Sequence, residues 1–154
     1  MKKADPSDPP GSMFELFNEI GIIHQLSTTV FNRTLPDGLH VSHFSVVNHL
    51  VRLGDGKTPL ALARAFQVTK ANMTNTVARL EERGLVATSP NPVDGRSKLV
   101  HLTDEGRAFR ERAIGALQPM IGRIETLIEK DLVLSALPAL RHLREALDSD
   151  RDEH

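Results

Sequence analysis

The chain of 154 residues contains no cysteine. This excludes structural disulfides, thiolate metal sites, iron–sulfur clusters and any sensor that works by thiol oxidation. No apolar run approaches the roughly 20 residues that span a bilayer, and the N-terminal segment has no apolar stretch after its two lysines. We therefore expect a cytoplasmic protein without a membrane partner.

Sequence motifs of common catalytic sites are also missing. There is no G-x-S-x-G nucleophile elbow, no phosphate-binding glycine loop and no H-E-x-x-H zinc motif. Histidines and serines are numerous but follow no catalytic spacing. We expect a protein that is not an enzyme and that needs no cofactor.

Acidic and basic residues nearly balance over the whole chain but are unevenly distributed. The net charge is −1 and the pI about 6.7, which argues against a protein that coats nucleic acid regardless of sequence. Residues 57–107 contain eight Lys and Arg against five Asp and Glu. Residues 1–56 contain four against six, and residues 108–154 contain seven against nine. The middle of the chain is its only net-positive part.

Length and composition indicate one globular domain per chain, because 40% of the residues are hydrophobic and 25% are charged. Residues 1–12 include three prolines and a glycine, which predicts a mobile N-terminal arm. Residues 149–154 are mostly charged, which predicts a frayed tail. The folded domain is therefore expected to span residues 13–148.

The segment 42–103 has the pattern of a winged helix-turn-helix. Ser42 is a candidate N-cap for its first helix, and Thr58 before a proline is a candidate N-cap for the next. After a short turn, Thr69 is positioned to cap a further helix, expected over residues 69–83. Two short helices joined by so short a turn are typical of the helix-turn-helix motif.

The expected helix over residues 69–83 has an apolar face of Met73, Val77 and Leu80, and its opposite face carries no acid before Glu81. A first turn without acids leaves the positive end of the helix dipole open to a phosphate. Asparagine amides can pair with adenine, and threonine or alanine methyl groups can contact thymine. We predict DNA contacts from Lys70, Ala71, Asn72, Thr74, Asn75 and Arg79. Arg79 either reaches a phosphate or pairs internally, and the alternative for the whole face is an ordinary solvated helix.

Residues 85–102 are predicted to form a wing. Two short alternating segments flank the turn-forming sequence PNPVDGRS, and Lys57 is expected to add a one-bridge strand behind them. Arg96 at the tip is a candidate for insertion into a narrow minor groove. Asp94 is interpreted as the residue that orients this arginine. The alternative is an exposed hairpin with an incidental charge pair.

The segments that flank the wing domain, residues 13–35 and 104–148, are predicted to be long helices with more apolar surface than one face of a surface helix requires. Pairing these helices across a two-fold axis would bury the surplus. We therefore interpret them as dimerisation helices. The alternative for the first of them is burial within its own monomer.

Three short stretches resemble the MarR family of transcriptional regulators. They are RLEERGLV at residues 79–86, D-G-R at residues 94–96 and L-T-D-E-G at residues 102–106. The resemblance covers about residues 13–148 and implies a mainly α fold with a small β-wing. It also implies a homodimer whose recognition helices enter successive major grooves while the wings reach flanking minor grooves. By this resemblance Thr74 and Asn75 read the major groove, and Asn75 stands where many relatives have arginine.

The resulting hypothesis is a homodimeric, sequence-specific DNA-binding regulator of a pseudo-palindromic operator, acting as a ligand-responsive repressor. The family resemblance implies a small aromatic or lipophilic effector bound between the dimer helices and the winged domain. The corresponding walls are Ile20, His24, Phe44, Val47, Phe109 and Ala113. The alternative is that these six residues are simply core.

Two other classes of function stay open at this stage. One is a winged-helix module whose exposed face binds a protein instead of DNA. The other is a metal-responsive regulator, suggested by the proximity in sequence of His40, His43 and His49, with His24 a possible neighbour. Because no carboxylate–histidine cluster at helical ligand spacing accompanies them, no residue is assigned as a metal ligand.

Overall fold

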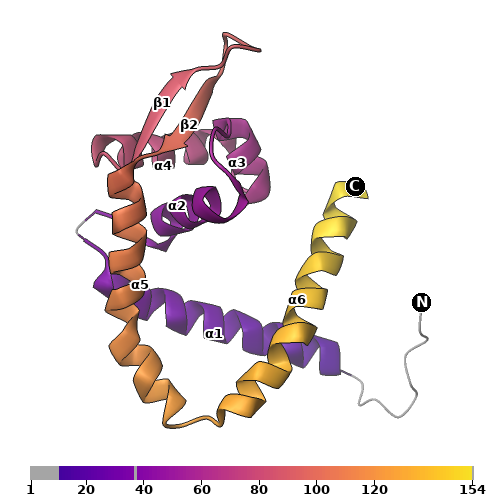
Figure 1. Cartoon of the computed structure of the whole chain (residues 1–154). Helices are drawn as coiled ribbons and strands as arrows, with labels where there is room; N and C mark the ends of the chain where they lie inside the picture. Colours follow the sequence, from indigo (N-terminus) through magenta and orange to yellow (C-terminus); the bar gives the residue numbers. More distant parts are fainter. Residues whose placement is uncertain (1–10, 37, 154) are drawn as a thin grey trace. The chain divides into compact units, whose positions relative to one another are not determined.

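The computed structural model of the chain describes residues 11–36 and 38–153 (Figure 1). It consists of two compact units, which divide inside a helix between Gly115 and Ala116. The predicted mobile arm lies outside the described residues except for Gly11 and Ser12. Ser12 already begins the first helix.

The described residues form six α-helices and one two-stranded antiparallel sheet, which confirms the predicted fold class of a mainly α protein with a small β-wing. The elements are α1 (Ser12–Thr34), α2 (Val41–Leu53), α3 (Pro59–Ala65), α4 (Lys70–Glu82), β1 (Val86–Pro90), β2 (Lys98–Leu102), α5 (Asp104–Glu125) and α6 (Lys130–Glu153). In the sheet, the pairing runs from Val86 with Leu102 to Pro90 with Lys98. None of the described helices is long and apolar enough to cross a membrane.

Threonine side chains start two of the helices as predicted. The Thr58 hydroxyl accepts the Ala61 backbone N–H at 3.1 Å, and the Thr69 hydroxyl accepts that of Asn72 at 3.1 Å. Each bond satisfies one of the amide groups that a helix N-terminus leaves without a partner. α3 and α4 are therefore fixed at the positions that the sequence predicts.

The prediction that Ser42 caps α2 is wrong, because the helix begins one residue earlier, at Val41. The Val41 backbone N–H donates to Oδ1 of Asn32 in α1, at 2.8 Å. The N-cap residue His40 donates its own backbone N–H to Nδ1 of His43, at 3.0 Å. Since a residue of α1 satisfies the first turn of α2, the start of this helix depends on tertiary structure.

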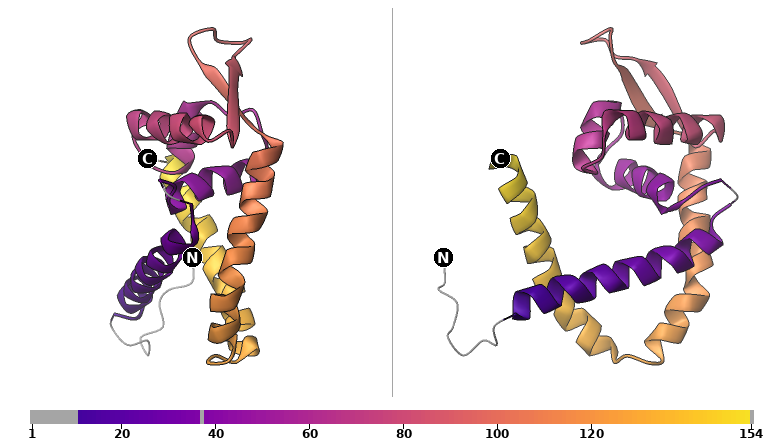
Figure 2. Two further views of the ribbon diagram at one scale, coloured as in Figure 1. Left: turned by 90° about the vertical axis from the view of Figure 1, so that its left-hand side faces the viewer. Right: turned by 180° about the vertical axis from the view of Figure 1, so that it is seen from behind.

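The core of the first unit lies between α2, α3, α4, the base of the wing and the start of α5. Its fully buried side chains include Val47 of α2, Leu62 of α3, Leu80 of α4 and Val100 of β2. Met73 and Val77 are also buried, which confirms the predicted apolar face of α4. Figures 1 and 2 show the β1–β2 hairpin projecting from these packed helices. The core thus holds α4 and the wing on the same part of the first unit.

Both units expose apolar helix surface. α1 has no buried residue, and Phe14 on it is 75% exposed. In the second unit, Leu127 is 82% exposed, and Leu132 and Leu147 of α6 are also exposed. Scattered exposed hydrophobic residues are common, but a whole helix without a buried side chain is typical of one that lacks its packing partner.

α6 continues to Glu153, past residue 148, where a frayed tail is predicted. An ion pair between Arg144 and Asp148 spans one helical turn, and the Ser149 hydroxyl donates to the Glu145 carbonyl oxygen at 3.0 Å. Such contacts between residues four apart support a helix that packing does not hold.

Gly106 allows α5 to start directly against the wing. A Cβ atom at this position would overlap the carbonyl oxygen of Leu85 and approach Cδ1 of Leu102 to 2.8 Å. The Leu85 carbonyl oxygen already accepts the Thr103 backbone N–H. Position 106 has no room for a side chain, because the backbone of Leu85 passes where the Cβ atom would lie.

We predict that Gly106→Ala destabilises the protein by about 1–3 kcal/mol, because the added methyl group forces the backbones of α5 and β1 apart. Gly115→Ala in the same helix is the matched control, since nothing lies within 4 Å of its Cβ position. That change should stabilise the protein by up to about 1 kcal/mol through helix propensity. Urea unfolding at equal protein concentrations measures both, and equal effects of the two substitutions would contradict the steric explanation.

Candidate DNA-binding surface

α4 presents an exposed polar face opposite its buried apolar face. Lys70, Ala71, Asn72, Thr74 and Asn75 are all exposed, and no acid lies in the first turn. The Thr74 hydroxyl donates to the Lys70 carbonyl oxygen at 2.8 Å, so its hydrogen is already used within the helix. The residues of α4 that are predicted to contact DNA, other than Arg79, therefore lie together on one accessible surface.

Arg79 is in a different position. Its Nε donates to the Gly38 carbonyl oxygen at 3.3 Å, and its guanidinium pairs with Glu82 one turn further along α4. Of the two possibilities open from the sequence, these contacts are those of the internal pair, and the DNA contact of Arg79 stays a prediction. Arg79 thus connects α4 to the turn between α1 and α2.

Polar contacts that the sequence does not predict link the wing to α4. One carboxylate oxygen of Glu81 in α4 accepts both the Thr88 backbone N–H, at 3.1 Å, and the Thr88 hydroxyl, at 2.7 Å. At the base of the hairpin, just after β2, the Thr103 hydroxyl donates to the Gly84 carbonyl oxygen at 2.7 Å. These contacts hold α4 and the wing as one body, so that a movement of one carries the other.

The base of the wing rests on the loop between α2 and α3. The Asp55 carboxylate accepts the Leu102 backbone N–H at 2.8 Å and lies 3.6 Å from Nδ1 of His101. The other ring nitrogen of His101 is hydrogen-bonded to the Ser89 hydroxyl at 2.9 Å. Lys57 forms the predicted single bridge to Val100. Asp55 and Leu102 are 47 residues apart, so no local sequence pattern could reveal their contact.

The tip of the wing is ordered by side chains that bind backbone. Asp94 accepts the Arg96 backbone N–H on Oδ1 at 3.0 Å, and the Asp94 carbonyl oxygen accepts the Ser97 backbone N–H at 3.0 Å. The described contacts of Asp94 are therefore with the turn itself and not with the arginine side chain. Asp94 can orient Arg96, but through the backbone.

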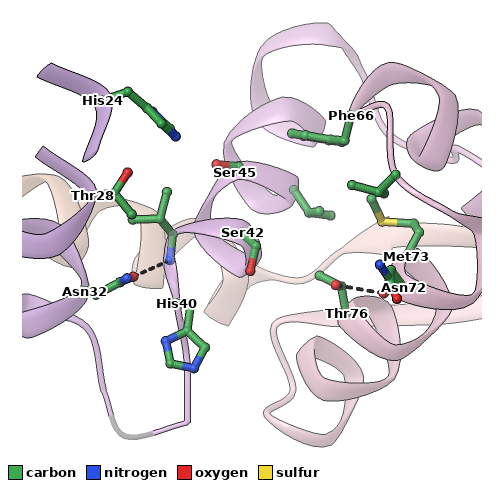
Figure 3. A pocket seen from close by; sticks show the side chains of 13 residues that line it. His24, Thr28, Asn32, His40, Ser42, Ser45, Phe66, Asn72, Met73 and Thr76 are labelled. Carbon is green, nitrogen blue, oxygen red and sulfur yellow. Dashed lines mark hydrogen bonds between the residues drawn. The ribbon is translucent and has the colours of Figure 1, made fainter. Parts of the chain in front are cut away.

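A cleft with a volume of about 560 Å³ lies between α1, α2 and α4 (Figure 3). α1 contributes His24, Thr28 and Asn32, the segment after α3 contributes Phe66, and α4 contributes Asn72. The described residues that line it include both polar and apolar side chains, but no Asp, Glu, Lys or Arg.

The predicted effector walls agree with this cleft only at His24. Val47, Phe109 and Ala113 are buried in the hydrophobic core, as the alternative of simple core residues implies. Phe44 packs edge-on against Phe31, with ring centroids 4.6 Å apart, and does not line the cleft. Ile20 also lies outside its lining. Phe109 of α5 fills the core and is not a wall of this cleft.

The histidines that suggest a metal site have other roles in the structure. Burial, followed by the nearby His40 and Arg79, lowers the pKa of His43, whose Nδ1 accepts a backbone N–H. Burial also lowers the pKa of His49, together with Lys57 and Arg52. Among residues 11–36 and 38–153, no three His, Asp or Glu side chains are placed to hold a metal ion. The geometry gives the metal-responsive alternative no support.

Comparisons with known proteins agree with this architecture. The MarR family profile matches residues 37–97. A transcriptional regulator of the helix-turn-helix type from Mycobacterium bovis is 32% identical over 117 residues, which cover 74% of this chain and 81% of the relative. The transcriptional repressor NicR of Pseudomonas putida is 28% identical, with 98% of each chain covered.

A solved structure extends the comparison. A mutant of MarR from Escherichia coli, crystallised with operator DNA, is 26% identical and aligns with a TM-score of 0.69 over 89% of this chain and 99% of its own. The fold and the exposed face of α4 define a DNA-binding transcriptional regulator of the winged helix-turn-helix class. The chain belongs to the MarR family, as its sequence motifs predict.

The hydrogen bond from Arg96 to Asp94 predicts different effects of two substitutions on DNA affinity. Asp94→Asn keeps an oxygen for the Arg96 N–H and removes a negative charge near phosphates, so affinity should be equal or higher. Asp94→Ala removes the acceptor and loosens the tip, so affinity should fall. Both affinities are measured by fluorescence anisotropy, in titrations of a duplex that the wild-type protein selects from a random-sequence library. An equal loss of affinity in the two variants would show that the charge, which both substitutions remove, and not the turn, is what matters.

Proposed function

We propose that the protein is a homodimeric transcriptional repressor that binds a pseudo-palindromic operator and responds to a small aromatic or lipophilic effector. The observation that carries the proposal is the exposed polar face of α4, which has no acid before Glu81 and is linked to a projecting wing by that residue. The proposal assigns the protein no catalytic activity and no cofactor. It places the protein in the cytoplasm, where operator DNA lies in a bacterium.

In this proposal α4 enters the major groove and the wing reaches the adjoining minor groove. Asn75 and Asn72 can form paired hydrogen bonds with adenine, and the methyl groups of Thr74 and Ala71 can contact thymine. Lys70 supplies a charge near the phosphates. The operator-bound structure of the Escherichia coli MarR mutant supports the same use of the fold.

Dimerisation is proposed because both units leave apolar helix surface exposed. α1 buries none of its side chains, and α6 exposes Leu132 and Leu147. A second copy of the chain offers the same surfaces, so a two-fold interface would cover them. A two-fold protein matches a palindromic site, with half-sites about 10 base pairs apart.

The sign of regulation is proposed from the relatives. NicR, which matches nearly the whole chain, is named a repressor, whereas BadR of Rhodopseudomonas palustris, 31% identical over 96 residues, is named an activatory protein. Repression is favoured because the match to NicR extends over more of the chain. A promoter–reporter assay with and without the protein tests this sign directly.

The cleft between α1, α2 and α4 is the proposed effector site. Its apolar walls include Phe66 and Met73, and its polar groups include His24 and Asn32, a combination that suits a small aromatic or lipophilic molecule. Asn72 belongs both to this lining and to the DNA-facing surface. An effector there can change DNA affinity only by as much as it prefers one position of α4 over another.

The alternative of a protein-interaction module predicts that the exposed face of α4 does not bind DNA selectively. Selection of bound duplexes from a random-sequence library separates the two functions. A palindromic consensus supports the proposed regulator, whereas recovery without any consensus contradicts it.

The same selection tests the role of Asn75. We predict that Asn75→Ala changes the base preference at one position of each half-site, by about 1–3 kcal/mol, because a bidentate contact is lost. The matched control is Ala78→Ser. Like Asn75, Ala78 is an exposed residue of α4, but it is not assigned to a DNA contact. An unchanged consensus for Asn75→Ala would remove this residue from the base-reading set.

The effector site is tested with a panel of small aromatic acids, phenols and lipophilic amides. We predict that at least one compound raises the melting temperature of the protein and weakens its DNA binding, because ligand binding to the folded state stabilises it. Ser45→Phe should abolish both effects by filling the cleft, whereas Ser45→Ala leaves room and should retain them. A compound that acts equally on the phenylalanine variant would place the effector site elsewhere.

A further inference from the structure

The tip of the wing carries an exposed apolar side chain that the proposed function does not yet use. Val93 is 94% exposed, the highest value among the large hydrophobic residues of the described chain. It lies in the turn between β1 and β2, three residues from Arg96. This turn is at the free end of the hairpin (Figure 2). Its exposure shows that it contributes little to the core, so its apolar character has no explanation in the fold.

Hydrogen bonds hold Val93 in a defined position. Its backbone N–H donates to Oδ1 of Asn91 at 3.0 Å, and Nδ2 of Asn91 donates to the Ser97 hydroxyl at 2.8 Å. The Asn91 backbone N–H also donates to the Ser97 carbonyl oxygen at 3.1 Å, which closes the loop. Because valine is branched at Cβ and has few side-chain conformations, a contact at this site loses little conformational entropy.

We propose that Val93 enters the minor groove beside Arg96 and selects against guanine in the base pairs that the wing covers. This inference rests on the proposed function, in which the wing reaches the minor groove. There, A·T pairs in either orientation present only acceptors, whereas a G·C pair adds the N2 amino donor of guanine. Valine has no acceptor for that amino group, so contact with a G·C pair buries a donor without a partner.

Val93 and Arg96 then have separate roles. The Arg96 guanidinium is attracted to the phosphates and to the negative potential of a narrow groove, and its contribution weakens as salt rises. Contact of the Val93 methyl groups with the groove releases no counterions, so it contributes nothing to the salt dependence. A preference against guanine in the base pairs under the wing that persists at high salt therefore belongs to the valine and not to Arg96.

The test uses a duplex that the wild-type protein selects from a random-sequence library. The base pairs flanking its half-sites are replaced by G·C or by inosine·cytosine pairs. Inosine lacks the N2 amino group but keeps the major-groove edge of guanine, so the two duplexes present the same major groove. The inosine pair also has one Watson–Crick hydrogen bond fewer, an effect that is the same for every protein variant. The wild-type protein should bind the inosine duplex at least about tenfold more tightly, in line with the usual cost of one unfavourable base pair.

Val93→Thr is the decisive variant, because threonine has the same shape but places a hydroxyl acceptor where valine has a methyl group. Its preference for inosine over guanine should fall to about threefold or less, with an unchanged salt slope and melting temperature. Val93→Ile, which adds a methylene, should retain the preference. Arg96→Ala should weaken binding to both duplexes and reduce the salt slope by about one, while keeping the preference.

Equal binding of both duplexes by the wild-type protein, or an unchanged preference in Val93→Thr, would overturn the inference. If Arg96→Ala still weakens binding in that case, the wing meets the minor groove and only the role of Val93 is wrong. If Arg96→Ala changes neither affinity nor salt slope, the proposed place of the wing fails as well. Failure to select any duplex would overturn the proposed function itself, together with this inference.

Discussion

The DNA-binding surface depends on the burial of one face of α4. Met73, Val77 and Leu80 pack into the core and fix the rotation of the helix about its axis. Because side chains on a helix repeat every 3.6 residues, this rotation decides that Asn72 and Asn75 point outward. A core that allowed α4 to rotate by one residue would present a different set of side chains to DNA without any change in the exposed sequence.

Burial alone does not fix the wing, whose two strands have few buried residues. Its position also depends on single polar contacts in the lower half of the hairpin: Glu81 with Thr88, Thr103 with Gly84, and Asp55 with Leu102. Exposed hydrogen bonds of this kind each contribute little to stability. These hydrogen bonds matter for geometry, because together they hold α4 and the wing in one relative position, from which the two can meet adjacent grooves.

The sequence predicts the elements better than the contacts between them. The threonine N-caps, the apolar face of α4 and the hairpin follow from local patterns, because each depends on residues within a few positions of one another. The start of α2 does not, since Asn32 of the preceding helix provides the acceptor for Val41. For a similar reason the sequence does not decide between a phosphate contact and an internal pair for Arg79, because its partner Gly38 is 41 residues away.

The predicted effector residues show a second limit of prediction from sequence. Apolar side chains on facing helices predict equally well a packed core and the wall of a pocket, and only the packing distinguishes the two. Phe109 and Ala113 fill the core, whereas His24 on α1 borders an open cleft. A spacing pattern shows which residues face inward, but not whether the space between them is filled.

The connection between α1 and α4 gives the proposed regulation a physical route. α1 contacts the start of α2 through Asn32, and the turn after α1 contacts α4 through Arg79 and Gly38. The cleft is lined by α1 on one side and by α4 on the other. An occupant of the cleft therefore opposes any approach of these helices, while Arg79 limits how far they separate. Since Glu81 links the wing to α4, the proposed regulation would shift α4 and the wing together, and a small displacement would misalign both with the grooves that they are proposed to enter.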